Sequence, residues 1–478
     1  MRWRPAQGDV LSFSLVGLLT ALAAALRLVA LGHQSLWLDE AQTAYEVRQS
    51  FRGMLSVVAN NELTPPFYYV LMWPWTRLAG SSEFMLRLPS AVFGTASVPL
   101  AFATGRAARS SLTGLVAAAF VATSVFMIWF SQEARAYALF VFLSIASIYF
   151  FLRLLETPRG VYLFWWTATA ALALLSHYFA AFLIGVQALW LLWVRRERAV
   201  VLAAAFLAAI EAALVPLAVH QAHAFPPPSV SGFKLRSHLR DLVFGFATVG
   251  YPARHVGLAL VALALLAGGF TLSGERADRR AVLLALGLAA GTLLVAPALE
   301  LASGAGVYNY RHAIGAWFPL ALALAVALAV RRFAWAGLVV ATALCAVSLV
   351  FVERTATRPA LQRDDWRGAF RVLPSPGSSP RALVTSWVFE RFPVEYYDRR
   401  ARPAKTVRTR ELVLVSVGQA VRARVPRTFR RVALEHVQRM TIVRYRAARP
   451  TAITRRELRP PGSRKRAIGL FLEPQAPS

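Results

Sequence analysis

The stretch SLVGLLTALAAALRLVALGHQSLWLDEAQTAYE, residues 14–46, joins a long apolar run to two adjacent acids. The apolar part has the length that spans a hydrocarbon core, about 20 residues. It begins after MRWRPAQ and lacks a small-residue cleavage site, so we expect a retained transmembrane helix and not a removed signal peptide. Asp39 and Glu40 then fall at a membrane surface, in a chain with only 24 Asp and Glu among 478 residues.

The composition extends this interpretation to most of the chain. It is 57% hydrophobic with a mean hydropathy of +0.49, which is too apolar for an ordinary soluble domain. Runs of similar length predict about eleven transmembrane helices. The predicted spans are 9–32, 88–106, 112–130, 136–154, 161–176, 179–194, 199–220, 255–273, 281–300, 312–330 and 333–352. Residues 65–80 are apolar but short and aromatic, which favours an interfacial helix.

The basic loops predict the orientation. Short arginine-rich connections alternate along the chain, as in RRER at 195–198 and GERADRR at 274–280, and such loops stay in the cytoplasm. We therefore expect a multi-pass membrane protein, with a cytoplasmic N-terminus and an extracytoplasmic C-terminus.

The net charge of +29 would suggest nucleic acid in a soluble protein. Arginine supplies nearly all of it, and a basic membrane protein already meets anionic headgroups. We expect membrane lipids as partners and no nucleic acid. The single cysteine, Cys345, excludes an internal disulfide.

Composition also divides the chain into domains. Residues 1–352 are expected to form the transmembrane catalytic domain, with 33–87 as its first extracytoplasmic loop. Residues 353–478 hold 28 Arg and Lys against 10 Asp and Glu, and include short β-like runs such as ELVLVSV. We expect a small basic α/β domain over 353–460 and a disordered tail over 461–478. The fold class is an α-helical polytopic membrane protein with a small extracytoplasmic α/β domain.

The first outer loop concentrates polar side chains. It carries Asp39, Glu40, Glu62 and Tyr68, and its length is typical of functional loops. A carboxylate just outside the bilayer can accept a proton from a hydroxyl nucleophile or bind a cation that neutralises phosphate. The alternative is that Asp39 and Glu40 only cap an interfacial helix.

Three further outward segments carry candidate site residues. WFSQEARAYAL at 129–139 places an acid, an arginine and a tyrosine close together; SHYF at 176–179 adds a histidine and a tyrosine; YNYRHAIGAWFP at 308–319 adds an arginine and a histidine. An arginine in such a place can hold a phosphate or simply snorkel to lipid headgroups. The candidates are Glu133, Arg135, Tyr137, His177, Tyr178, Arg311 and His312.

These segments resemble the bacterial GT-C glycosyltransferases. LWLDEA, TPPFYYVLMWPWTRLAGSSEFMLRLPSAVFG, WFSQEARAYAL and SHYFA follow in the order seen in the protein-mannosyltransferase-like and ArnT-like branch, also described as family 39 or RgtA/B/C/D-like. The resemblance covers about residues 10–330, with a weaker echo in RDDWRGAFRVL at 363–373. Relatives commonly have His-Pro-Pro where this chain has Thr64-Pro65-Pro66, and often Tyr at the position of His312.

The resemblance implies a location in the bacterial inner (plasma) membrane and a concrete activity. Such enzymes move a sugar from a polyprenyl-phosphate donor to a lipid, glycan or protein hydroxyl on the extracytoplasmic face, usually with inversion. It makes Asp39 the catalytic residue, with Glu40 as its neighbour in the motif. By the same resemblance, Arg135, Tyr137 and Arg311 bind the donor phosphate. The remaining substrate-binding candidates are His177, Tyr178, Tyr68, Glu133 and Glu62.

The chemistry suits the residues. A cation must stabilise the leaving phosphate, and an acid must take the acceptor proton on the opposite side of the anomeric carbon. No cofactor is expected with certainty. Because the first loop lacks a dense acidic cluster, metal-independent catalysis is favoured, although some relatives use a divalent cation.

The alternative is a transporter or flippase for a lipid-linked molecule. Its support is Glu211, an ionisable group well inside a predicted span, which is expensive and usually faces a cavity. Transporters tend to show paired repeats, and no matching halves are present. Glu211 is equally compatible with lining an active cavity or pairing with a buried arginine.

Overall fold

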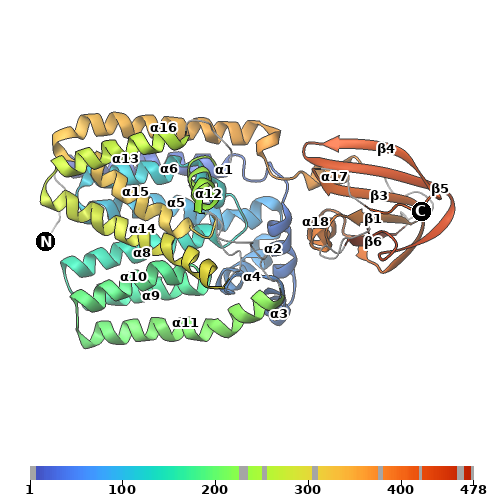
Figure 1. The fold of residues 1–478 in the computed structure, drawn as a ribbon, viewed down its shortest axis with the longest axis horizontal. Helices are drawn as coiled ribbons and strands as arrows, with labels where there is room; N and C mark the ends of the chain where they lie inside the picture. Colours follow the sequence, from blue (N-terminus) through green and yellow to red (C-terminus); the bar gives the residue numbers. More distant parts are fainter. Residues whose placement is uncertain are drawn as a thin grey trace. The chain divides into compact units, whose positions relative to one another are not determined.

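The computed structural model describes residues 7–224, 235–249, 256–303, 311–374, 380–418, 423–459 and 468–474. The chain forms two compact units (Figure 1). The first consists of Met1–Leu31, Ser50–Gly80 and Met85–Arg354, and the second of Gly32–Gln49, Ser81–Phe84 and Thr355–Ser478. The second unit therefore takes in a part of the first outer loop that we had assigned to the transmembrane domain.

Helices make up the first unit. They are α1 (Gln7–Leu28), α3 (Phe51–Asn61), α4 (Phe67–Ala79), α5 (Glu83–Ala108), α6 (Ser111–Thr123), α7 (Val125–Ser131), α8 (Tyr137–Glu156), α9 (Gly160–Ser176), α10 (Ala180–Val194), α11 (Arg198–Ala224), α12 (Leu235–Thr248), α13 (Val256–Ser273), α14 (Arg276–Ser303), α15 (Ile314–Leu328), η1 (Arg331–Phe333) and α16 (Ala334–Thr357). Each predicted span overlaps one of them, and the predicted interfacial helix is α4. In the described residues, six helices are long and apolar enough to cross a membrane, or seven if the bent pair α6–α7 is one span.

The predicted span 112–130 is a broken helix. α6 and α7 meet at an angle of 57° around Ser124, whose Oγ accepts a hydrogen bond from the Met127 N–H. The break exposes carbonyl groups at the end of α6, which must find donors in an apolar environment. The buried Arg27 of α1 supplies them: its Nη2 lies 2.9 Å from the Val121 oxygen and its Nη1 3.2 Å from that of Ala122.

Among the six candidate spans, α8 is the most buried, with 72% of its apolar stretch inside the protein. α11, α13 and α16 are largely exposed, as helices that face lipid are. A buried polar chain ties α8 to its neighbours. Trp166 of α9 donates to the Gln187 Oε1 of α10 at 2.8 Å, and Gln187 donates to the Ser147 Oγ of α8 at 3.1 Å. Hydrogen bonds of this kind fix the helices that carry the site residues.

The second unit is built on a six-stranded sheet of order β2-β6-β1-β3-β5-β4. β1 and β3 are parallel and the other pairs antiparallel. Its elements are α2 (Leu38–Arg48), η2 (Pro359–Leu361), α17 (Trp366–Arg371), β1 (Arg381–Thr385), η3 (Val388–Glu390), α18 (Arg391–Tyr397), β2 (Arg402–Pro403), β3 (Thr406–Val417), β4 (Phe429–Val437), β5 (Met440–Thr454) and β6 (Gly469–Glu473). The expected helical membrane protein with a small C-terminal α/β domain is thus confirmed.

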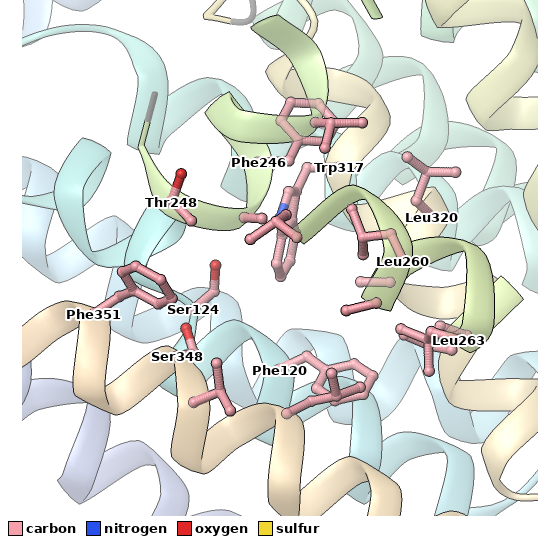
Figure 2. A pocket seen from close by; sticks show the side chains of 18 of the residues that line it. Phe120, Ser124, Phe246, Thr248, Leu260, Leu263, Trp317, Leu320, Ser348 and Phe351 are labelled. Carbon is pink, nitrogen blue, oxygen red and sulfur yellow. The ribbon is translucent and has the colours of Figure 1, made fainter. Parts of the chain in front are cut away.

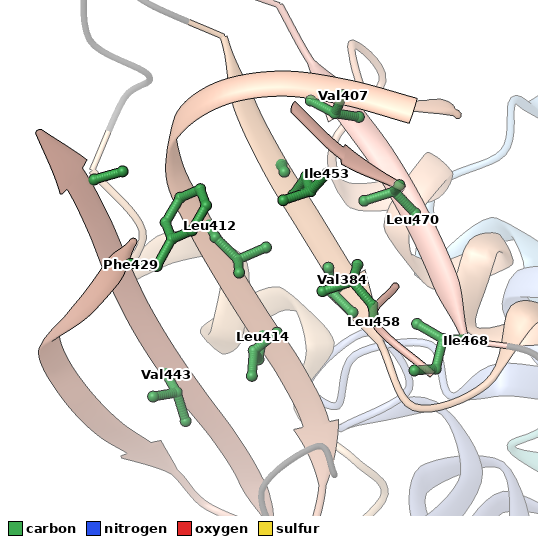
Figure 3. Packing of buried hydrophobic residues seen from close by; sticks show 12 residues of the cluster. Val384, Val407, Leu412, Leu414, Phe429, Val443, Ile453, Leu458, Ile468 and Leu470 are labelled. Atoms are coloured by element: carbon green, nitrogen blue, oxygen red, sulfur yellow. The ribbon is translucent and has the colours of Figure 1, made fainter. Parts of the chain in front are cut away.

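Alternating side chains give this sheet two apolar faces. Val384, Leu412, Leu414 and Leu470 pack on one face (Figure 3). Leu383 and Val413 point to the other face, where they meet Trp366 of α17 and Val394 of α18. Helices α17 and α18 therefore pack against the central strands of the sheet.

β6 differs from the expected disordered tail. Gly469–Glu473 pairs antiparallel with Arg381–Thr385. The short GLFLE sequence forms a strand because it buries Leu470 and Phe471 on opposite faces of the sheet. The rest of the predicted tail, 461–467 and 475–478, lies outside the described residues.

Candidate functional site

An ion pair at the entrance to α8 is the centre of the first group of candidate residues. Arg135 makes two parallel hydrogen bonds to Glu62, through Nη1 to Oε1 and through Nη2 to Oε2, the second at 2.8 Å. Its Nη1 also donates to the Tyr69 hydroxyl at 3.0 Å. All three side chains are buried. Such a bidentate pair fixes the plane of the guanidinium group. We call Glu62, Tyr69 and Arg135 the Arg135 cluster.

Three local features bring the cluster together. Glu62 ends α3, and Tyr69 lies in the first turn of α4, just after Pro65 and Pro66. Arg135 lies in the short connection between α7 and α8. This connection is held to the end of α1, because the Gln132 side chain donates to the carbonyl oxygens of Leu26 and Arg27 at 3.2 Å each.

Tyr68 and Glu133 flank the cluster. The Tyr68 hydroxyl lies 3.4 Å from the Ser90 Oγ, which in turn donates to the Arg135 carbonyl oxygen at 3.3 Å. Glu133 is buried two residues before Arg135. Through Ser90, Tyr68 thus helps to hold the backbone at Arg135 in place.

A group of rings adjoins these residues. The His177 ring lies 5.8 Å from Tyr137 and 6.4 Å from His312, and stacks on Phe140 at 4.9 Å, centroid to centroid. Burial lowers the pKa of His177 to about 3, and the nearby His312 and Arg135 act in the same direction. Its Nδ1 accepts the Phe179 N–H at 3.3 Å, which leaves the proton of the neutral ring on Nε2. His177 is therefore a neutral hydrogen-bond donor at physiological pH and not a cation.

Tyr178 points to a different set of partners. Its hydroxyl donates to the Gln221 Oε1 of α11 at 2.9 Å, and the Gln221 Nε2 donates to the carbonyl oxygens of Val58 and Thr64. Through Gln221, Tyr178 thus stabilises the segment that ends at Thr64. Arg311 and His312 lie in a turn before α15, both partly exposed.

Asp39 and Glu40 belong to the second unit and occupy the first turn of α2. The N-cap residue is Trp37, whose side chain makes no cap hydrogen bond, and the two acids follow it in the first turn. Glu40 is fully buried, with its Oε2 3.9 Å from the Arg363 Nε. Asp39 is partly exposed. Of the two adjacent acids, Asp39 is therefore the one open to a substrate.

The C-terminal part of the second unit holds α2 in place. The Leu36 N–H donates to the Tyr397 hydroxyl at 2.6 Å, and the Ser35 Oγ donates to the Asp364 carbonyl oxygen at 2.8 Å. Tyr397 also donates to Glu83. These bonds join the residues just before α2 to α18 and to the segment before α17.

Sequence reasoning missed Tyr69, Arg363 and Tyr397 as site residues. Tyr69 stands next to the predicted Tyr68, and only the fold shows which tyrosine reaches Arg135. Arg363 opens the RDDW segment that carried the weak family echo, and that echo was the available signal. Nothing in the sequence marks Tyr397, which acts through a contact more than 300 positions away.

An apolar cavity of about 400 Å³ lies within the first unit (Figure 2). Its wall is built by α6, α12, α13, α15 and α16, with Phe120, Phe246, Leu263, Trp317 and Phe351 among its large side chains. A few hydroxyls, such as Ser124 at the α6–α7 break and Ser348, provide the polar part of the lining. The size and apolar character suit a hydrocarbon ligand.

No group of three or more His, Cys, Asp or Glu side chains within the described residues is arranged to hold a metal ion.

Comparison with known proteins agrees with these features. Residues 64–223 match the family model for dolichyl-phosphate-mannose-protein mannosyltransferase. The apo crystal structure of ArnT from Cupriavidus metallidurans matches with a TM-score of 0.52 at 13% identity, covering 90% of this chain and 98% of that one. No curated protein matches the sequence significantly. The family match and the ArnT-like fold confirm the resemblance to GT-C glycosyltransferases.

Two other solved structures are more distant in shape. ArnT from Cupriavidus metallidurans bound to undecaprenyl phosphate has a TM-score of 0.41 at 14% identity, covering 92% of this chain and 98% of that chain. Oligosaccharyltransferase AglB from Archaeoglobus fulgidus, in complex with an inhibitory peptide and a dolichol-phosphate, has a TM-score of 0.45 at 11% identity, with 81% and 63% covered.

Proposed function

We propose that this protein is a membrane glycosyltransferase that transfers a sugar from a polyprenyl-phosphate donor to a hydroxyl acceptor on the extracytoplasmic face, with inversion. The observation that carries the proposal is that the motif residues Arg135, Tyr137 and His177 gather with Glu62 into one buried group within an ArnT-like fold.

The donor phosphate is assigned to two arginines with different roles. The terminal nitrogens of Arg135 are engaged by Glu62 and Tyr69, so this guanidinium is fixed before any substrate arrives. Such preorganised charge costs no reorganisation as the phosphate leaves. Arg311 is partly exposed and closes on the phosphate as the second cation. The neutral His177 offers its Nε2 proton to a sugar or phosphate oxygen.

In the proposed reaction, Asp39 acts as the general base. It takes the proton from the acceptor hydroxyl as that oxygen attacks the anomeric carbon, while the bond from that carbon to the phosphate oxygen breaks. The leaving phosphate needs no protonation. Glu40 does not share the role, because its carboxylate is buried against Arg363.

The apolar cavity is assigned to the polyprenyl tail. ArnT from Cupriavidus metallidurans binds undecaprenyl phosphate, and this cavity offers a mainly hydrocarbon surface inside the membrane domain. Because the tail enters the cavity from lipid and not from water, its binding there depends on packing against the apolar wall.

The test is donor turnover by purified protein in proteoliposomes. A panel of polyprenyl-phosphate sugars is supplied with a glycolipid extract as acceptor, and free polyprenyl phosphate and the anomeric configuration of the product are measured. The proposal expects release from one donor and an inverted product. Movement of a donor across the bilayer without release of its phosphate would instead establish the transporter alternative.

A further inference from the structure

A second cavity, of about 340 Å³, lies in the second unit and has a polar wall. Residues 32–35 form one side. Three arginines, Arg363, Arg367 and Arg371, line it together with a single carboxylate, Asp365. The donor, acceptor and base described above leave this cavity unused.

The three arginines are held to different degrees. Arg363 is buried and faces Glu40 at 3.9 Å, and Arg367 forms an ion pair with Glu83 at 2.9 Å. Both guanidinium groups are thus fixed by acids that are not among the lining residues. Arg371 is exposed at the end of α17. The cavity therefore has two cations held by ion pairs and one exposed cation.

The single acid of the lining is engaged with the backbone. The Asp365 Oδ1 accepts the Gly368 N–H at 2.9 Å, which fixes the carboxylate as the N-cap of α17. The remaining polar side chains of the lining are those of His33, Gln34, Ser35, Gln362 and Gln438. Donor groups therefore predominate in the wall, which is the arrangement that suits an anion.

The chain places this cavity at a membrane surface. Residues 32–35 follow closely on Leu28, the end of α1, and residues 362–371 follow on Thr357, the end of α16. Both helices are apolar enough to cross a bilayer. Lining residues that follow two spans so closely lie at the depth of the lipid headgroups, just beyond the hydrocarbon core. The anions enriched at that depth are phosphates.

We propose that this cavity binds a phosphate group at the membrane surface, gripped by Arg371 and by the fixed guanidinium groups of Arg363 and Arg367. The phosphate comes from a lipid headgroup or from free phosphate, which have the same charged oxygens. The proposal is independent of glycosyl transfer, because its test measures binding and needs no turnover.

The experiment measures ligand-dependent thermal unfolding of the full-length protein in detergent. The probes are inorganic phosphate, a short-chain phosphatidic acid and a phosphatidylcholine of the same chain length. Wild type is compared with Arg371→Gln and with Arg430→Gln, a matched exposed arginine on β4 away from the cavity. Unfolding without ligand shows whether each variant is folded.

The proposal expects phosphatidic acid or inorganic phosphate to raise the unfolding temperature of wild type and Arg430→Gln. Arg371→Gln should need about tenfold more of the same probe, the effect of losing one charge-assisted contact. A response to phosphatidic acid at far lower concentration than to inorganic phosphate identifies the lipid as the source, and equal responses identify free phosphate. Equal titrations for all three proteins, or no response by wild type to either probe, would overturn the proposal.

Discussion

Removing both charges of the Glu62–Arg135 pair should cost less stability than the sum of the losses from removing each charge alone. Glu62→Gln leaves a buried guanidinium facing a neutral amide, and Arg135→Gln leaves a buried carboxylate; the side chains are only 3% and 10% exposed. Loss of one partner of such a pair costs about 3–5 kcal/mol. Because Gln keeps part of the hydrogen bonding, we expect about 3 kcal/mol for each single variant.

The double variant Glu62→Gln/Arg135→Gln has no unpaired charge. We expect it to be destabilised by less than the sum of the single variants, with a coupling of about 2 kcal/mol, within the range found for residues of one ion-pair network. The assay is equilibrium unfolding in mixed micelles of increasing dodecyl sulfate fraction, followed by tryptophan fluorescence.

Glu275→Gln serves as the control for the loss of one carboxylate. Glu275 pairs with Arg109 at 2.7 Å, but its side chain is 69% exposed. An exposed pair contributes about 0–1 kcal/mol. If the double variant at Glu62 and Arg135 lost the sum of the two single losses to within about 0.5 kcal/mol, the pair would not act as one unit and the reasoning would be refuted.

Three further predictions concern other parts of the molecule. Tyr397→Phe removes the acceptor of the buried Leu36 N–H, so the free energy of unfolding should fall by about 1–3 kcal/mol in the same assay. No loss would mean that another acceptor replaces the hydroxyl. Burial raises the pKa of Glu390 to about 7, so between the ordinary pKa of a glutamate and pH 7 the folded state binds more protons than the unfolded state. The free energy of unfolding should therefore fall by roughly 3 kcal/mol as the pH rises through that window. Glu390→Gln should flatten this dependence of stability on pH. Leu263→Trp fills the apolar cavity and should raise the KM for a polyprenyl-phosphate donor, whereas the exposed Leu258→Trp on the same helix should not; equal KM values would exclude the cavity as the tail site.

Hydrophobic runs were sufficient to locate the membrane helices, because a span needs a long apolar segment whatever surrounds it. The break at Ser124 was not predictable from them. The apolar run continues through it, and the carbonyl groups it frees are satisfied by Arg27, a residue from another helix. The prediction of a disordered tail did not anticipate β6 for a similar reason. GLFLE is too short to be recognised as a strand from sequence, because it depends on pairing with β1.

The candidate site shows the same division. Family motifs marked Arg135 and His177 as candidates, and the fold brings them into one group with Glu62. The sequence could not show that Glu40 is buried against Arg363 while its neighbour Asp39 is partly exposed, because that difference depends on a partner in the C-terminal unit. Nor could composition indicate that this unit holds the helix that carries the proposed base.

The most direct test of the central claim is the transfer rate of Asp39→Asn beside wild type, with Asp241→Asn, an exposed acid on α12, as the control. All three proteins are first shown to unfold at the same temperature. Asp39→Asn should lose at least about a hundredfold in rate, the usual contribution of a general base, while donor binding is retained and Asp241→Asn transfers sugar like wild type. Full turnover by Asp39→Asn would contradict the assignment of Asp39 as the base.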